Sequence, residues 1–267
     1  MTSRLALGTT ILIAMAFVMG ISPVQGWNNG QGTFYNQPLQ LKLEAEVRRR
    51  LPDYFEDPSV DRLLTESFYP IGWSKDGKFA YYLEPVDEAC GCYFAKLYIL
   101  DLKTDKVLWS YDYSSDDQEN PEKSPQSLQA LWKEKQKLFS DKLREYDIKP
   151  QGSAALLLFP IKYEGDQLTL DLKLKEKEDK PANTVGVGHA ALQLSSERQG
   201  KKTVFEKTYT VEQDGVLPLE IKVLGYVQSP LEPRIALILI EVGRGYEGPP
   251  HVARVRVVGS SLTTGFK

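Results

Sequence analysis

Histidine and cysteine are scarce in this chain, and their scarcity excludes several kinds of site. Among 267 residues there are two histidines and two cysteines. Two cysteines cannot form a four-cysteine zinc site or a dense disulfide framework. His189 and His251 lie too far apart in the sequence for a His-Glu-x-x-His zinc helix. Either histidine could still act as a general base, but a single histidine in a strand-rich chain is more often structural.

An excess of basic charge is also missing. The chain has 33 Lys plus Arg and 36 Asp plus Glu residues, which gives a formal net charge of −3. Nucleic-acid binding needs a basic excess or a basic stripe, so the balance argues against nucleic acid as the main partner. With 42% apolar and 26% charged residues, the composition is that of an ordinary globular protein.

Motifs of common catalytic machinery are absent from the sequence. The chain has neither the Gly-x-Ser-x-Gly elbow of serine hydrolases nor a Gly-x-x-x-x-Gly-Lys phosphate loop. Gly186-x-Gly188 is too short for a dinucleotide fingerprint, and it opens a predicted strand rather than a helix. We therefore expect no cofactor, and the sequence favours a binding protein over an enzyme.

Residues 1–26 have the pattern of a signal peptide. A positive charge at Arg4 precedes an uncharged apolar run from Leu5 to Ile21, which Ser-Pro ends. Cleavage after Gly26 would leave Trp27 as the mature N-terminus. Cleavage is favoured over an uncleaved anchor, because the run is short for a bilayer span. The expected location is secreted or periplasmic, with no membrane span once the signal is removed.

Two helices are expected. Residues 27–58 form a lead-in in which Leu43, Val47 and Leu51 fit a helical stripe. Residues 125–147 have the clearest helical pattern, and we expect that helix to pack on a sheet of the same protein. Ser124 is the expected N-cap. The apolar face of the second helix consists of Leu128, Leu131, Trp132, Leu138, Phe139, Leu143 and Tyr146.

The rest of the predicted domain, residues 59–267, has the pattern of short antiparallel strands. Blade-like hairpins are expected at 68–113 and 219–260, with Asp76-Gly77 as a strong turn signal in the first. Between them, leucines at 168, 170, 172 and 174 alternate with polar residues, as in a strand with one buried face. The expected fold class is mainly β: a propeller-like domain, or a sandwich of antiparallel meanders with one long packed helix.

The two hairpins share one pattern of residues. A glycine and an aromatic residue come first, a turn follows, and after the turn come a basic residue, an apolar residue and an alanine. The first copy runs from Gly72 through Ser74-Lys75-Asp76-Gly77-Lys78 to Ala80, and the second from Gly225 through Ser229-Pro230 to Ala236. The first copy resembles the blade motif of TolB-type β-propellers, a WD40-like repeat whose blades carry a Ser-Pro-Asp-Gly-Lys turn. Here Lys75 replaces the usual proline, and the second copy lacks Asp-Gly.

The paired arrangement also resembles a group of predicted secreted bacterial proteins with no established activity. This resemblance implies a partial or degenerate propeller-like domain, and it marks structural hairpins rather than an active site. If the hairpins are equivalent, Ala80 and Ala236 should occupy matching strand positions that face a core.

Cys90-Gly91-Cys92 is the sharpest local feature of the sequence. Because export favours oxidation, a Cys90–Cys92 disulfide in an exposed loop is the leading interpretation. A soft-metal site with Asp87 or a histidine, and free or intermolecular cysteines, are the alternatives. Carboxylates also gather near this loop, at Asp87 and Glu88, and near the corresponding second loop, at Glu241 and Glu247. Solvated loop charge is the favoured interpretation of all four, although paired carboxylates there could serve hydrolysis or bind calcium.

Three functional hypotheses follow from these patterns. The leading one is a secreted or periplasmic, non-catalytic binding or scaffold protein whose partner is an unknown protein or envelope component. The second is a secreted hydrolase with a site at the loop end of the sheet. The third is a thiol-redox or metal-handling protein acting through Cys90 and Cys92.

Overall fold

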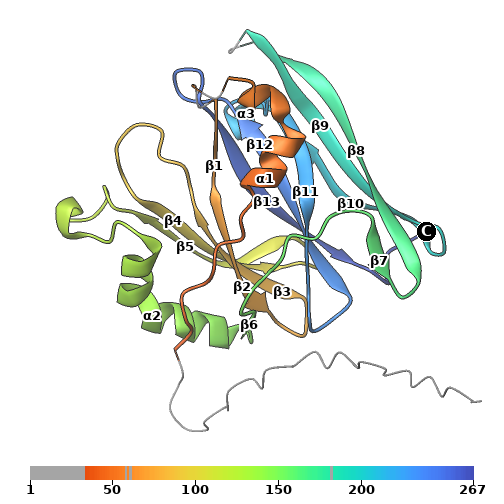
Figure 1. Ribbon diagram of the computed structural model, residues 1–267, viewed down its shortest axis with the longest axis horizontal. Helices are drawn as coiled ribbons and strands as arrows, with labels where there is room; N and C mark the ends of the chain where they lie inside the picture. Colours follow the sequence, from red (N-terminus) through yellow and green to blue (C-terminus); the bar gives the residue numbers. More distant parts are fainter. Residues whose placement is uncertain (1–33, 58, 60–61, 181–182) are drawn as a thin grey trace, which may run out of the picture. The chain divides into compact units, whose positions relative to one another are not determined.

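Three β-sheets and three α-helices make up the described part of the computed structural model, which comprises residues 34–57, 59, 62–180 and 183–267 (Figure 1). The predicted signal peptide and its cleavage site at Trp27 lie outside the described residues. Among the described residues, no helix is long and apolar enough to cross a membrane.

Sheet A is an antiparallel meander with one short added strand. Its order is β5-β4-β3-β2-β6. The strands are β2 (Ser67–Trp73), β3 (Lys78–Glu84), β4 (Phe94–Asp101), β5 (Lys106–Ser114) and β6 (Lys149–Pro150).

Sheet B is built from the last three strands and the first one. Its order is β1-β13-β12-β11, and only the pairing of β1 with β13 is parallel. The strands are β1 (Leu63–Thr65), β11 (Glu220–Gln228), β12 (Arg234–Gly243) and β13 (His251–Ser261).

Sheet C is a second antiparallel meander, with the order β10-β9-β8-β7. The strands are β7 (Ile161–Tyr163), β8 (Asp166–Asp179), β9 (Thr184–Ser196) and β10 (Gly200–Thr208). The helices are α1 (Glu44–Arg50), α2 (Leu128–Glu145) and α3 (Val211–Asp214), with short 3₁₀ turns at Pro52–Phe55 and Pro121–Lys123.

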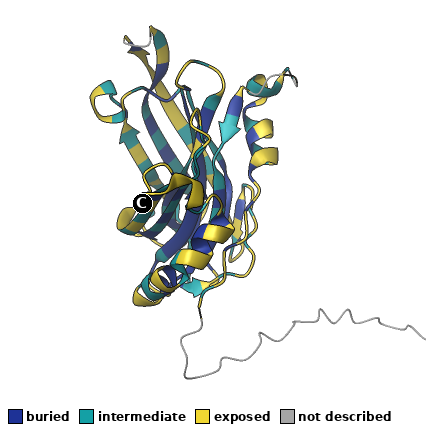
Figure 2. Ribbon diagram, turned by 90° about the vertical axis from the view of Figure 1, so that its left-hand side faces the viewer, coloured by how far each residue is buried: buried dark blue, intermediate teal, exposed yellow. Residues whose placement is uncertain are grey.

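Three hydrophobic cores stack these elements in the order α2, sheet A, sheet B, sheet C. One core joins α2 to sheet A, the next joins sheet A and α1 to sheet B, and the third joins sheet B to sheet C. Figure 2 shows the buried residues running through the middle of this stack. The central strand β12 is therefore apolar on both faces: Ala236 and Ile238 face sheet A, whereas Leu237 and Leu239 face sheet C.

The mainly β character and the antiparallel meanders that the sequence predicts are confirmed. The sheets are stacked in layers, and a propeller is not shown. The predicted domain boundaries stay predictions. The stripe of Leu43, Val47 and Leu51 is confirmed as a buried face, although α1 begins only at Glu44.

Two details predicted for the long helix are wrong. The N-cap of α2 is Ser127, whose hydroxyl accepts a hydrogen bond from the Ala130 amide, rather than Ser124. Ser124 instead ends the preceding 3₁₀ turn in extended conformation. Leu138, predicted to be buried, is 39% exposed, whereas Trp132 and Phe139 are buried against sheet A. The predicted apolar stripe is wider than the face of α2 that sheet A covers.

The two predicted hairpins, β2–β3 and β11–β12, share a local geometry. Ala80 and Ala236 are both fully buried in strands, as predicted. In each hairpin the strand register shifts immediately before a glycine, Gly72 in β2 and Gly225 in β11. The segment that follows α2 runs past both positions, pairing Pro150 with Gly72 and then Leu157 with the residue after Gly225.

Candidate functional site

The strongest candidate site is a cleft between two strand edges, where sheets B and C face each other. β7 pairs with β8 only from Asp166 to Leu168, so β8 is an edge strand beyond Leu168. β11 pairs with β12 along one edge, and within the described residues its other edge is paired only at the Leu157–Tyr226 bridge. The two free edges lie on the same side of the stack, because β8 and β11 are in contact.

Mostly apolar side chains line this cleft, which has a volume of about 220 Å³. Leu192 of β9 is fully buried and forms its floor, whereas Leu170 and Leu172 of β8 are half-buried walls. Exposure along this face of β8 rises from 0% at Leu168 to 38% at Leu174. The apolar face of β8 therefore extends beyond what sheet B covers. The full lining is Arg50, Phe159, Leu170, Leu172, Leu192, Lys222 and Val223.

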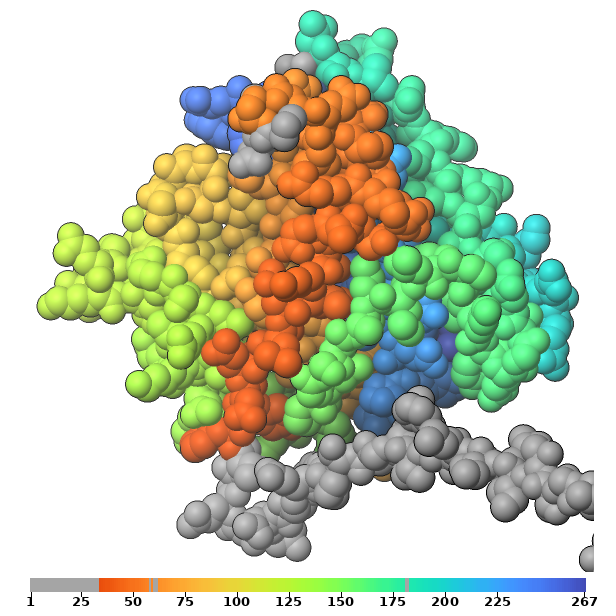
Figure 3. Space-filling view, viewed as in Figure 1, coloured from red at the N-terminus to blue at the C-terminus, as the bar shows by residue number. Residues whose placement is uncertain are grey.

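Three segments that are distant in sequence border the opening. On the face shown in Figure 3, α1 (orange), residues 150–160 (green) and β8 (blue-green) lie next to one another. α1 packs on β11 and brings Arg50 to the cleft. The Leu157–Tyr226 bridge brings in Phe159, whose ring centroid lies 5.5 Å from that of Tyr226.

Two cationic side chains, Arg50 and Lys222, lie at the opening of this apolar cleft. The side chains of Arg50 and Lys222 are 34% and 38% exposed, so both reach solvent while lining the cleft. Lys222 Nζ lies 3.0 Å from Glu220 Oε2. Arg50 Nε lies 3.8 Å from Glu46 Oε2, and this nitrogen is buried without a hydrogen-bond partner among the described residues. An apolar floor with cations at its rim is suited to an amphipathic anion.

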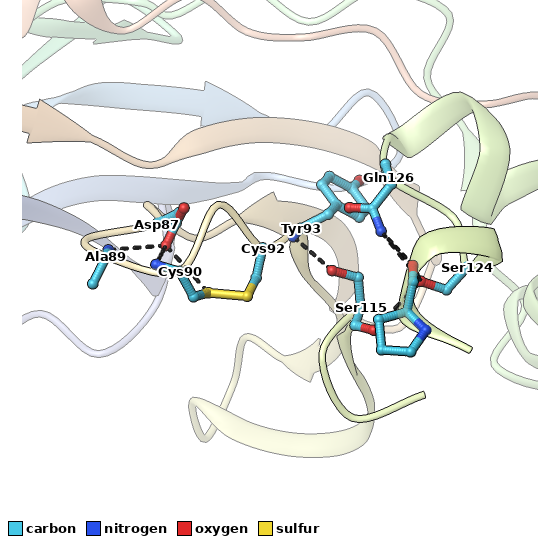
Figure 4. Close-up of a disulfide and its surroundings, with 9 residues drawn as sticks. Asp87, Ala89, Cys90, Cys92, Tyr93, Ser115, Ser124 and Gln126 are labelled. Carbon is cyan, nitrogen blue, oxygen red and sulfur yellow. Dashed lines mark hydrogen bonds between the residues drawn. A yellow bond between two sulfur atoms is a disulfide. The ribbon is translucent and has the colours of Figure 1, made fainter. Parts of the chain in front are cut away.

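The cysteines lie where the sequence predicted, in an exposed loop between β3 and β4 (Figure 4). Their sulfurs are 1.99 Å apart, the separation of a disulfide bond. Asp87 Oδ1 accepts hydrogen bonds from the amides of Ala89 and Cys90, at 3.1 and 3.0 Å. These backbone donors, Ala89 first, lower the pKa of the Asp87 carboxyl. Asp87 therefore orders the backbone of the loop.

We expect this bridge to contribute little to stability. The two cysteines are separated by one residue, so a bond between them removes little chain entropy from the unfolded state. The double variant Cys90→Ser/Cys92→Ser should lower the free energy of unfolding by no more than about 1–2 kcal/mol. In denaturant unfolding of natively exported protein, a loss above about 3 kcal/mol would favour a structural metal instead. Thiol labelling should find neither cysteine free before reduction and two thiols after it.

The four predicted carboxylates do not form one cluster. Glu88 Oε2 accepts a hydrogen bond from the Tyr246 amide at 3.0 Å, so the two loops do meet. Glu247 is exposed beside Tyr246. Glu241 instead belongs to β12, where its carboxylate binds Arg256 and accepts a hydrogen bond from the Tyr209 hydroxyl at 2.6 Å. Glu241 therefore joins sheet B to the end of sheet C.

The two histidines lie in separate surroundings. His189 Nε2 lies 3.2 Å from Glu206 Oε1 across the β9–β10 pair. His251 Nδ1 accepts a hydrogen bond from the Gly245 amide, and burial, followed by the charge of Arg244, lowers its pKa. Among the residues that the structure describes, no group of three or more His, Cys, Asp and Glu side chains could hold a metal ion.

The cleft is not predicted by the sequence. The alternating leucines of β8 predict one apolar face of a strand, but they do not show that this face is longer than the part of sheet B that covers it. Arg50 and Lys222 were not singled out, because nothing in the local sequence shows that α1 and β11 meet. The feature of the sequence that could have indicated the cleft is Leu174, the fourth leucine of the alternation. It is exposed because sheet B does not cover that part of β8.

Comparisons with known proteins do not assign the chain, and the TolB-type resemblance stays a prediction. No known protein family, characterised protein or solved structure matches it.

Proposed function

We propose that this protein is an exported, non-catalytic binding protein whose ligand occupies the cleft between β8 and β11. The observation that carries the proposal is the apolar cleft of about 220 Å³, open at two strand edges and rimmed by Arg50 and Lys222. Apart from these two cations, its lining is aliphatic or aromatic. Such a lining supports holding an apolar group away from water rather than performing chemistry on it.

The proposed location limits the kind of ligand. The signal-peptide pattern of residues 1–26 supports export. An exported protein meets envelope components, including lipids and their degradation products. The proposed ligand is therefore an apolar or amphipathic envelope component rather than a nucleic acid.

We also propose that the β2–β3 and β11–β12 hairpins are copies of one blade-like unit. The buried alanines and the register shift before Gly72 and Gly225 support this relation. Phe79, which precedes Ala80, faces sheet B, and Ile235, which precedes Ala236, faces sheet C. The two hairpins thus present corresponding residues in the same direction along the stack, as successive blades of a propeller do.

A neutral fluorescent probe tests the proposed binding role. We expect the mature protein to bind N-phenyl-1-naphthylamine saturably, with one site per chain. Leu172→Asp places a charge in the cleft wall and should weaken the binding at least about tenfold, since burying a charge against apolar groups is unfavourable. The measurement is a fluorescence titration, with circular dichroism to verify that each variant is folded.

Leu108→Asp is the matched control for this experiment. Leu108 is a 37% exposed leucine on the edge strand β5 of sheet A, and it does not line the cleft. This variant should bind the probe as the parent protein does. Absence of saturable binding, or equal loss in both variants, would refute the proposed site.

A further inference from the structure

We infer that the cleft takes a single-chain aliphatic carboxylate, with the carboxylate held by Arg50 and Lys222 and the chain lying along Leu170 and Leu172. This inference rests on the proposed function and names the ligand class of the same site. It depends on the charge at the rim, the unused hydrogen-bonding capacity of Arg50 and the size of the cleft.

Arg50 is available for a ligand because Glu46, the carboxylate next to it, is hydrogen-bonded to Arg49 instead. Arg49 binds Glu46 through Nε at 2.9 Å and through Nη2 at 2.6 Å. Glu46 therefore lies 3.8 Å from Arg50 Nε, beyond hydrogen-bond distance. Nε itself is buried, whereas the Arg50 side chain as a whole is 34% exposed, so a ligand carboxylate would bind the accessible part of the guanidinium group rather than Nε.

Lys222 adds a second positive charge, and its ion pair with Glu220 is weak. Its ion pair with Glu220 joins side chains that are 38% and 33% exposed, and ion pairs that solvent reaches contribute little to stability. The ammonium group can therefore exchange Glu220 for a ligand oxygen with little loss. The planar guanidinium of Arg50 matches the two oxygens of a carboxylate.

The size and lining of the cleft determine which apolar group the ligand can carry behind its carboxylate. Its volume of about 220 Å³ lies below the roughly 300–1,000 Å³ of pockets for drug-sized ligands. A single flexible chain fits such a space better than a two-chain lipid. The contact surface for that chain is formed by the half-buried side chains of Leu170 and Leu172 on β8.

Three probes with the same chain and different head groups test the inference. Dodecanoate, dodecanol and dodecyltrimethylammonium should each be titrated at pH 8, below their micelle concentrations, as competitors of N-phenyl-1-naphthylamine. We expect dodecanoate to bind at least tenfold more tightly than dodecanol, and the trimethylammonium compound to bind most weakly. Arg50→Gln and Lys222→Gln should each reduce the preference for dodecanoate over dodecanol severalfold, because each removes one of the two cations that hold the carboxylate.

Arg48→Gln is the matched charge control. Arg48 lies on α1 and packs over the Phe55 ring at 4.3 Å, and it does not line the cleft. Its removal lowers the net charge equally, so a similar loss of preference in this variant would overturn the inference. Equal binding of all three probes would also overturn it while leaving the proposed function standing. If none of the three probes binds and the neutral fluorescent probe also fails, the proposed function fails with it.

Discussion

Replacement of Trp132 by alanine is expected to lower the free energy of unfolding by about 3–5 kcal/mol. Trp132 is 2% exposed, and it lies in the core between α2 and sheet A. Its ring packs against Phe139 and Tyr82, with centroids 5.2 and 6.3 Å away. The indole Nε1 also donates a hydrogen bond to the Tyr35 carbonyl at 3.0 Å. The substitution therefore opens a large cavity. It also removes the hydrogen-bond donor that holds the Tyr35 carbonyl, in the segment before α1, against α2.

Leu138→Ala is the matched control on the same helix. Leu138 is 39% exposed, so its truncation should change stability by no more than about 0.5 kcal/mol. Both variants can be measured by urea unfolding followed by far-UV circular dichroism. Similar midpoints for Trp132→Ala and the parent protein would show that α2 does not pack on sheet A in solution, and that its apolar stripe is available to a partner.

Local patterns predicted most of the secondary structure because the governing interactions are local. The apolar period of α2 and the Asp76-Gly77 turn signal are each contained within one short stretch of the chain. The double-sided burial of β12 is visible as an uninterrupted apolar run from Ile235 to Ile240. By contrast, the exposure of Leu138 depends on where the surface of sheet A ends, and no short pattern encodes that boundary.

The candidate site was harder to predict because it depends on contacts between distant segments. The parallel pairing of β1 with β13 and the stacking of sheet C on sheet B join parts that are far apart in the chain. Arg50 and Lys222 line one cleft because α1 packs on β11, which is another contact between distant segments. The cysteine loop, in contrast, could be located from the sequence, since both cysteines and Asp87 lie in one short segment.

Replacement of Gly225 by alanine is expected to lower the free energy of unfolding by about 3 kcal/mol and to disrupt the cleft. A Cβ atom at this position would lie 2.4 Å from the Leu157 carbonyl oxygen, far inside van der Waals contact. The clash is with backbone, so the passing segment must move and the Leu157–Tyr226 bridge must break. Phe159, two residues later, lines the cleft and would move with it.

Gly72→Ala separates the effect on stability from the effect on the cleft. Its Cβ would lie 2.0 Å from the Lys149 carbonyl oxygen, where the same segment passes sheet A. We expect a comparable loss of stability, but unchanged probe binding at temperatures where the variant is folded. Gly152→Ala is the neutral control for both, because no atom lies within 4 Å of its added Cβ. Gly225→Ala alone should weaken N-phenyl-1-naphthylamine binding, and equal weakening in Gly72→Ala would mean that the binding site is not the cleft beside β11.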